Sequence, residues 1–265
     1  MVGQVTTTSL TSGDAPVFTY PAACDAELEL LEIVTMALVV LEGERPCKLG
    51  PYDRARCTLV YLRKHDTLEQ IAAGFGIGVA TAWRYVNDTI ERLAAFAPSL
   101  TEALTSHHAD GYVLLDGTVA ETDRVAAAGH FSGKARREGV NLQVIAAEEG
   151  KLLWISPALP GGVHDVRAAR EHGIIEACAQ LDLEVLADKG YQGAGGTVIT
   201  PIKRRPDTEL PDKHKKSNRV QASLRAPVER TISRIKQWRI FRHARISPNR
   251  LTSAAAAILT LMIYT

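Results

Sequence analysis

The amino-terminal part of the chain has a helical pattern of apolar and polar positions. Asp25–Leu41 starts with acidic residues and continues as an apolar run, and Asp53–Arg63 can bury its leucines on one side. We expect one helix in each segment. Residues 1–24 are polar and rich in Thr and Ser, so a flexible tail is predicted there. The helical region is predicted over residues 25–98.

Two further helices, joined by a short glycine turn, are predicted within this region. Asp66 or Thr67 can cap the first helix, and Gly76-Ile77-Gly78 separates it from the second. The inward apolar positions are Leu68, Ile71, Ala72 and Phe75 in the first helix and Trp83, Val86, Ile90 and Leu93 in the second. This arrangement is typical of a helix-turn-helix, although an ordinary helical hairpin has the same pattern.

The outward face of the second helix carries residue types that bind DNA. Its members are Thr81, Arg84, Tyr85 and Asn87. Arg, Tyr and Asn side chains can reach phosphates and base edges in a major groove. We therefore predict DNA contacts from Arg84, Tyr85 and Asn87.

From Gly111 onward the apolar residues form short strand-like runs. The predicted strands are Tyr112–Asp116, Asn141–Ala147, Leu152–Ser156, Leu183–Asp188 and Thr197–Ile202, with a helix over Asp165–Gln180 and basic helices at the end. Such an order indicates an α/β (α+β) domain, a mixed β-sheet flanked by helices, over residues 108–265. Arg204–Arg219 is polar, basic and contains proline, which predicts a mobile loop.

Three carboxylates stand at places where chemistry is expected. Asp116 and Asp188 each end a predicted apolar strand, and Glu229 follows Pro227 at the predicted start of a basic helix. Ligands gather at the carboxyl ends of strands in open α/β sheets, and carboxylate oxygens suit hard divalent cations. Taken one at a time, however, each residue could equally serve as a turn-former, a cap or a helix-dipole partner.

Charge is distributed unevenly along the chain although the net charge is only +1. Between Lys203 and Arg250 there are 15 Lys or Arg against 4 Asp or Glu, and the remainder holds 16 basic and 26 acidic residues. We expect a surface that follows phosphates, with Trp238 and Phe241 among its cations. Lys134, Arg136 and Arg137 form a second basic turn, which either contacts DNA or is simply solvated.

Nothing in the sequence predicts export or a membrane span. The first twenty residues lack Lys and Arg, unlike a signal peptide, and the apolar stretches are shorter than the ~20 residues of a spanning helix. The four cysteines are scattered, which favours free thiols over a zinc site or disulfides. We therefore expect a cytoplasmic protein.

Several segments occur together in an order that is specific for one protein family. They are LLDGT (114–118), HFSGKARREGVNLQV (130–144), ISPALPGGVHD (155–165), LADKGYQG (186–193) and LRAPVERTISRIKQWRIFRH (224–243). In these segments the chain resembles bacterial insertion-sequence transposases of the DDE superfamily, within the group related to Harbinger-type transposases. The resemblance runs from about Tyr52 to the C-terminus and includes the helix-turn-helix.

This resemblance implies a fold and a catalytic set. The family places its acidic triad on an RNase H-like fold, and by resemblance the triad is Asp116, Asp188 and Glu229, separated by 71 and 40 residues. These residues would bind two Mg²⁺ ions, with Mn²⁺ as a substitute. Arg225 and Lys236 match a family signature of phosphate-holding residues at the expected spacing.

One position in these segments departs from the family pattern, and one further match bears on the site. Where related transposases have Tyr, this chain has Ala222, which leaves the triad intact but puts a tyrosine's role near the DNA end in doubt. His164-Asp165 also matches the family motif, and we expect Asp165 to cap the helix that follows it, with a direct role in the active site as the alternative.

The function implied by the resemblance is DNA transposition. The protein would bind the terminal inverted repeats of its own element as double-stranded DNA, cut the ends and join them to target DNA, as a homodimer on DNA near the bacterial nucleoid. Two other functions stay open: a catalytically inactive DNA-binding descendant, and a host-recruited metal-dependent endonuclease that cleaves without transposing.

Overall fold

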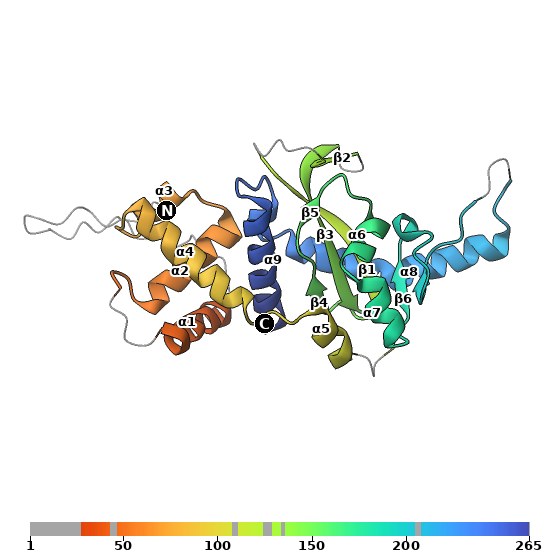
Figure 1. Ribbon diagram of the computed structural model, residues 1–265, viewed down its shortest axis with the longest axis horizontal. Helices are drawn as coiled ribbons and strands as arrows, with labels where there is room; N and C mark the ends of the chain where they lie inside the picture. Colours follow the sequence, from red (N-terminus) through yellow and green to blue (C-terminus); the bar gives the residue numbers. More distant parts are fainter. Residues whose placement is uncertain are drawn as a thin grey trace, which may run out of the picture.

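The computed structural model describes most of the chain (Figure 1). The described residues are 28–42, 47–107, 111–123, 129–133, 136–204 and 208–264. The predicted tail over residues 1–24 and the basic residue Lys134 lie outside them. Within these ranges, no helix is both long enough and apolar enough to cross a membrane.

Five helices make up the amino-terminal region as far as the structure describes it. They are α1 (Leu28–Glu42), α2 (Pro51–Lys64), α3 (Leu68–Gly74), α4 (Val79–Ala94) and α5 (Leu100–His107). Sequence analysis did not predict α5. Its signal was a capping box, in which the Ser99 hydroxyl accepts from the Glu102 amide at 3.3 Å and the Glu102 carboxylate accepts from the Ser99 amide at 2.8 Å.

Helices α3 and α4 form the predicted helix-turn-helix. Thr67 is the N-cap of α3, and its side chain and that of Gln70 make a reciprocal capping box. The turn passes through Gly76, whose φ of +61° is a left-handed conformation that glycine adopts without steric cost. The prediction that these two helices pack across a glycine turn is confirmed.

The orientation of α4 differs from the prediction at two aromatic residues. Trp83, predicted to face inward, is 42% exposed, and Tyr85, predicted to face outward, is only 2% exposed. The reason is that α4 packs against α2 on one side and against the last helix of the chain on the other. The Tyr85 ring lies beneath the Arg54 guanidinium, and its hydroxyl accepts from the Lys48 amide at 3.0 Å.

A mixed β-sheet forms the centre of the carboxyl-terminal part. Its strands are β1 (Val113–Glu121), β2 (Phe131–Ser132), β3 (Arg137–Ala147), β4 (Leu152–Ile155), β5 (Leu159–Pro160), β6 (Val185–Ala187) and β7 (Val198–Ile199). The order is β2-β3-β1-β6-β7, with β4 and β5 also paired to β3. Pairing is antiparallel between β1 and β3 and parallel from β1 to β6 and from β6 to β7. The fold is therefore the predicted helical region followed by a mixed sheet flanked by helices.

The helices that cover the sheet differ from the prediction in their boundaries. The helix predicted over Asp165–Gln180 is two helices, α6 (Asp165–Glu171) and α7 (Ile174–Gln180). Gly173 separates them with a φ of +69°. Side chains alternate across a strand, and Asp116 contacts a residue of α8 whereas a Cβ at Gly117 would point at α6. Helices α6 and α8 therefore lie on opposite faces of the sheet.

Helix α8 (Asp212–Ile235) includes much of the segment that was predicted to be a loop. Its first half is largely exposed and projects from the body of the protein (Figure 1). Pro227, predicted at the first position of a helix, lies instead inside α8. Proline there removes one backbone hydrogen bond, yet Val228 beside it is fully buried against the sheet domain. This packing offsets the loss.

The final helix, α9 (Pro248–Ile263), lies between the amino-terminal helices and the sheet (Figure 1). It packs against α4 and against β4, and the Thr260 hydroxyl donates to the Leu93 carbonyl at 2.9 Å. Trp238 and Phe241, which we expected on a phosphate-binding surface, are buried. Both residues belong to the hydrophobic core that the two parts of the chain share.

Loss of the α3 cap should weaken the amino-terminal region. In Thr67→Ala, the Gln70 amide loses the acceptor that now lies 3.3 Å away. We expect the free energy of unfolding, measured by urea titration, to fall by about 1 kcal/mol. Thr105→Ala, at an exposed position inside α5, is the matched control and should change it by less than about 0.5 kcal/mol. Equal effects from both substitutions would contradict a capping role for Thr67.

Candidate active site and DNA-facing surfaces

The parallel pairing of β1 with β6 places Asp116 and Asp188 side by side. The last paired residues are Leu115 and Ala187, and each aspartate is the next residue in its chain. Asp116 does not end its strand as predicted, because β1 continues to Glu121 in antiparallel pairing with β3. Only the β6 side of β1 becomes free at this point, and the two carboxylates stand where the sheet opens.

Asp116 accepts from a backbone amide and forms an ion pair. One oxygen, Oδ1, accepts from the Gly117 amide at 2.9 Å, and the other, Oδ2, is 3.3 Å from a terminal nitrogen of Arg225. Both side chains of this ion pair are largely shielded from solvent, at 15% and 10% exposure. Burial of a guanidinium is costly unless it is paired, so the positive charge of Arg225 directly offsets the negative charge of Asp116.

Asp188 begins the short 3-10 turn η1 (Lys189–Tyr191). Its Oδ1 accepts from the Gly190 amide at 2.6 Å. The predicted role as a turn-former is therefore present in the structure, together with the position beside Asp116. The turn-forming role and a place beside Asp116 are therefore compatible in one geometry.

Glu229 lies on α8 one turn after Arg225, and its side chain is exposed. Because Pro227 is inside the helix, Arg225, Glu229 and Lys236 follow one another along the same side of α8. Across the described ranges, no three His, Cys, Asp or Glu side chains come close enough to hold a metal ion. The donor chemistry suits a hard cation, but in this arrangement Asp116, Asp188 and Glu229 do not form such a group.

Asp165 is a third aspartate near this point, and sequence analysis assigned it a different role. It is the first residue of α6 rather than its cap, since His164 occupies the N-cap position. Asp165 is 9% exposed, and its carboxylate accepts from the Asn141 side-chain amide at 2.9 Å. A Cβ on Gly117 would overlap Oδ1 of Asp165, and one on Gly190 would lie 3.1 Å from its Oδ2. Asp165 thus touches the residue after Asp116 and the turn after Asp188.

The pKa of the Tyr191 hydroxyl is affected by the carboxylates near this point. Its side chain is fully buried, and burial raises the pKa of its hydroxyl well above the ordinary value. The carboxylates of Asp165, Asp116 and Asp188 raise this pKa further, while Arg225 lowers it. The hydroxyl is therefore a permanent hydrogen-bond donor near three negative charges.

An open pocket of about 370 Å³ adjoins these residues. It is lined on one side by Gly117, Asn141 and Asp165 and reaches Lys236 at the end of α8. Of the two predicted phosphate-holding residues, Lys236 faces this pocket whereas Arg225 is paired with Asp116. Asp116, Asp188 and Glu229 do not line the pocket, so a phosphate group there would meet the Lys236 ammonium and the Asp165 carboxylate.

The basic surface predicted near the C-terminus is present along α8 and beyond it. The exposed cations include Lys203, Arg204, Lys213, Lys215, Lys216, Arg219, Arg230, Arg234, Arg239, Arg242 and Arg245. Of the second basic turn, Arg136 is exposed in a left-handed conformation. Arg137 is held by Glu121 at 2.6 Å. The charge bias in the sequence therefore corresponds to an exposed cationic surface.

The helix-turn-helix presents part of the predicted DNA-facing set. Arg84 is exposed, whereas Tyr85 is in the core. Asn87 is half-buried, and its amide already donates to the Trp83 carbonyl and accepts from Arg250. The exposed residues Val79, Ala80, Trp83 and Arg84 lie in the first half of α4, so this half is the part of the helix that can enter a groove.

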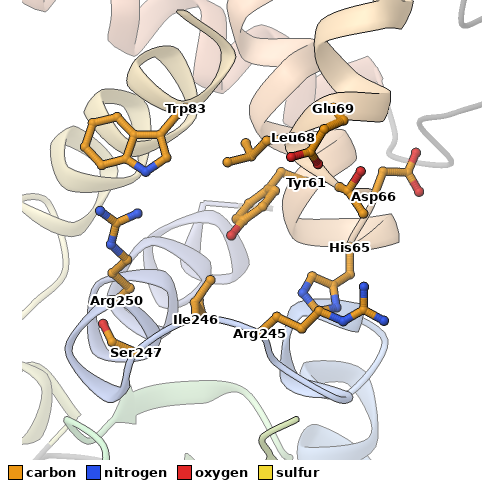
Figure 2. A pocket seen from close by; sticks show the side chains of 11 residues that line it. Tyr61, His65, Asp66, Leu68, Glu69, Trp83, Arg245, Ile246, Ser247 and Arg250 are labelled. Atoms are coloured by element: carbon orange, nitrogen blue, oxygen red, sulfur yellow. The ribbon is translucent and has the colours of Figure 1, made fainter. Parts of the chain in front are cut away.

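A second, larger pocket of about 500 Å³ separates the helix-turn-helix from the segment before α9. Figure 2 shows Trp83 above Arg250 on one side and His65 with Arg245 on the other. The Arg250 guanidinium lies 4.7 Å from the centre of the Trp83 ring. This pocket mixes anionic and cationic side chains, and none of Asp116, Asp165 and Asp188 lines it, so we assign it no catalytic role.

Cysteine chemistry does not contribute to the site. Burial raises the pKa of the Cys57 and Cys178 thiols to about 12, with Asp53 adding to the effect at Cys57. Both therefore remain protonated at neutral pH and are poor nucleophiles. Among the described cysteines, which are all free thiols as predicted, Cys47 is exposed.

Comparison with known proteins agrees with both halves of the fold. A family model described as DDE superfamily endonuclease matches residues 115–263, and one described as helix-turn-helix of DDE superfamily endonuclease matches residues 47–98. A protein of Streptomyces albus G, assigned as the transposase of insertion sequence element IS112, is 30% identical over 76% of this chain and 75% of its own length. A protein of Microchaete diplosiphon, assigned as the transposase of element IS702, is 28% identical over 75% and 74%. No solved structure gives a significant match.

The close approach of Asp165 to Gly117 predicts that this position tolerates only glycine. In Gly117→Ala the new methyl group would overlap the Asp165 carboxylate, and we expect the free energy of unfolding to fall by about 1–3 kcal/mol. Gly133→Ala, where a Cβ meets nothing within 4 Å, is the control in the same urea titration. A Gly117→Ala protein as stable as the control would show that Asp165 is not held where the structure places it.

Proposed function

Because the chain belongs to the DDE superfamily endonucleases, we propose that it is the transposase of an insertion sequence. It would bind the terminal inverted repeats of its own element, cleave the DNA there and join the freed ends to target DNA. The observation that carries this proposal is the register of β1 and β6, which leaves Asp116 and Asp188 adjacent where the sheet opens. The similarity to both relatives over about three quarters of their length also supports this proposal.

The proposed catalytic set is Asp116, Asp188 and Glu229. Their carboxylates would hold two Mg²⁺ ions, or Mn²⁺ in their place, on the strength of their oxygen donors and position. Bound there, the ions would neutralise phosphate charge and lower the pKa of the attacking water. The protein's own part is to hold the two aspartates at fixed spacing on a rigid sheet and to orient the scissile phosphate between α8 and the strand ends.

Glu229 must approach the two aspartates for all three to act together. Its helix already contacts β1, β3 and β6, and Arg225 one turn earlier reaches Asp116. A rotation of the Glu229 side chain, or a small shift of α8 at Pro227, would bring the third carboxylate toward the site. DNA phosphates provide the driving force, since they compete with Asp116 for Arg225 and attract Lys236.

DNA binding is proposed to involve three surfaces. The first half of α4 would enter a groove of the terminal repeat with Arg84 foremost. The exposed cations of α8 would follow the phosphate backbone toward the site. Lys134, Arg136 and Arg137 would contact the DNA beside the repeat. To do so, Arg137 must exchange its ion pair with Glu121 for one with a phosphate. Tyr85 no longer qualifies because it is buried.

Transposition joins two element ends, so we propose that two copies of the chain act together on DNA. Each copy would bring one helix-turn-helix and one carboxylate set. A dimer on DNA would then present both ends to one target. The proposal is tested by the stoichiometry of the protein–DNA complex in analytical ultracentrifugation.

Cleavage of DNA that carries the ends of the element tests the proposed catalytic set. Wild-type protein with Mg²⁺ or Mn²⁺ should cut a labelled duplex at the repeat boundary. Asp188→Asn should lower the rate by at least about 10³-fold while the dissociation constant for the duplex stays within about threefold, because the side chain keeps its size and its acceptor for Gly190. Asp182→Asn, at an exposed turn before β6, is the control.

Each result distinguishes the proposal from its rivals. Binding without cleavage by wild type and variant alike would indicate an inactive DNA-binding protein. Cleavage without strand transfer into a target plasmid would indicate an endonuclease that does not transpose.

Recognition of the repeat by α4 is tested separately. Arg84→Ala should weaken binding to the repeat by about 5- to 100-fold, corresponding to about 1–3 kcal/mol. Arg167→Ala, an exposed arginine on α6, should leave specific binding almost unchanged. The measurement is fluorescence anisotropy with repeat and scrambled duplexes at several salt concentrations. Equal losses on both duplexes would mean that Arg84 contacts only phosphates.

A further inference from the structure

Four buried polar side chains form one hydrogen-bonded chain beneath the strand ends. The Tyr191 hydroxyl donates to Gln143 Oε1 at 2.6 Å, Gln143 Nε2 donates to Asn141 Oδ1 at 2.7 Å, and Asn141 Nδ2 donates to Asp165 Oδ1 at 2.9 Å. The members come from η1, β3 and the start of α6. Each of them is at least nine-tenths buried.

The direction of this chain is determined by its two ends. Asn141 Nδ2 also donates to the Val163 carbonyl at 3.1 Å, and a carbonyl and an ionised carboxylate can only accept. The Asn141 amide must therefore turn its oxygen toward Gln143, and Gln143 must turn its oxygen toward Tyr191. At that end the Tyr191 hydroxyl has to donate, which agrees with its raised pKa.

Stability alone gives no reason to bury these groups. A buried hydrogen-bonded polar chain is no more stabilising than apolar side chains of the same shape, and each unmet partner costs about 1–3 kcal/mol. An apolar set would suffice to pack α6 against β3. The chain instead joins, through rigid bonds, three places around the proposed catalytic aspartates.

Those three places are the backbone at Gly117, which follows Asp116, the backbone at Gly190, and the η1 turn that follows Asp188 and ends at Tyr191. The Asp165 carboxylate sits against Gly117 and against Gly190, where a Cβ would lie 3.1 Å from its Oδ2. At the other end, Tyr191 closes the η1 turn whose N-cap is Asp188. The Gln143 backbone amide is fixed in turn by the Ser156 hydroxyl at 2.8 Å. Displacement of the backbone at Gly117 or Gly190 would therefore disturb the packing of Asp165.

We infer that Asp165, acting through Asn141, Gln143 and Tyr191, is a positioning residue that fixes the spacing of Asp116 and Asp188. The inference rests on the proposed function and adds to it a structural determinant outside the acidic triad. Asp165 touches the two backbones directly, and Tyr191 transmits the same constraint to the η1 turn. The chain makes the pair of aspartates a preorganised unit before DNA arrives.

Single substitutions at the two ends of the chain test this inference. Asp165→Asn keeps the size of the side chain, and Tyr191→Phe removes only the donor. Each should lower the rate of Mn²⁺-dependent cleavage by about 10- to 100-fold and raise the half-saturating Mn²⁺ concentration, as loss of an outer support for metal-holding residues does. Mn²⁺ binding followed by electron paramagnetic resonance without DNA should weaken in parallel. Binding of the repeat duplex should stay within about threefold.

Tyr264→Phe, at an exposed position, is the matched control and should behave as wild type. All proteins are compared at a temperature well below their unfolding midpoints, measured by circular dichroism. A purely structural role of the chain would lower the midpoint of Tyr191→Phe but leave its half-saturating Mn²⁺ concentration unchanged. That result would overturn the inference.

The double variant Asp165→Asn/Tyr191→Phe tests whether both ends act through one chain. Because residues of one network are not additive, we expect the double variant to lose no more activity than the worse single variant. Multiplicative losses would overturn the linkage through Asn141 and Gln143. If wild-type protein neither binds Mn²⁺ nor cleaves DNA, the proposed function fails and the inference with it. If wild type is active and both single variants match it, the inference alone fails.

Discussion

The parallel pairing between β1 and β6 is the constraint on which the candidate site depends. Only three residue pairs form it, from Val113 with Val185 to Leu115 with Ala187, but they determine which residues emerge together. A shift of one residue in this register would turn a carboxylate toward the opposite face of the sheet. The antiparallel partner β3 continues past this point and supplies Asn141 and Gln143 beneath it.

The carboxylates at this edge have partners on both faces of the sheet. On the α8 face, Arg225 forms a shielded ion pair with Asp116. On the α6 face, Asp165 accepts a hydrogen bond from Asn141. A site that concentrates carboxylates without an equal number of cations attracts positive charge. This imbalance is the physical basis for expecting cations there, and Arg225 is the group with which they would compete.

The carboxyl-terminal helix α9 packs against both parts of the protein and joins them. Because α9 packs against α4 and β4 alike, the helix-turn-helix shares a hydrophobic core with the sheet domain. The second half of α4 is used for this packing, which leaves only its first half for DNA. The same contact explains why Asn87 is bonded to Arg250 and why Tyr85 is not available to a ligand.

Local patterns in the sequence were sufficient for much of the fold. The helix cap expected at Asp66 or Thr67, which is Thr67, and the glycine turn at Gly76 depend on neighbouring residues, and both were predicted correctly. Helix boundaries around Gly173 and Pro227 were wrong. Gly173, in a left-handed conformation, separates α6 from α7 where the apolar pattern predicted one helix. Pro227 lies inside α8, next to the buried Val228, although proline usually starts or breaks a helix.

Only the tertiary structure decided the contacts between segments that are distant in the sequence. The sequence by itself determined the mixed fold, the helix-turn-helix and the identity of the strand-end aspartates, because these follow from periodicity, turn chemistry and family motifs. It did not determine which face of α4 is buried, since that depends on α9, 163 residues away at the Asn87–Arg250 bond. Nor did it reveal the role of Asp165, because its partners lie on β1, β3 and η1. Hydrogen bonds between buried side chains depend on atomic positions that pairing and packing create, so no local pattern encodes them.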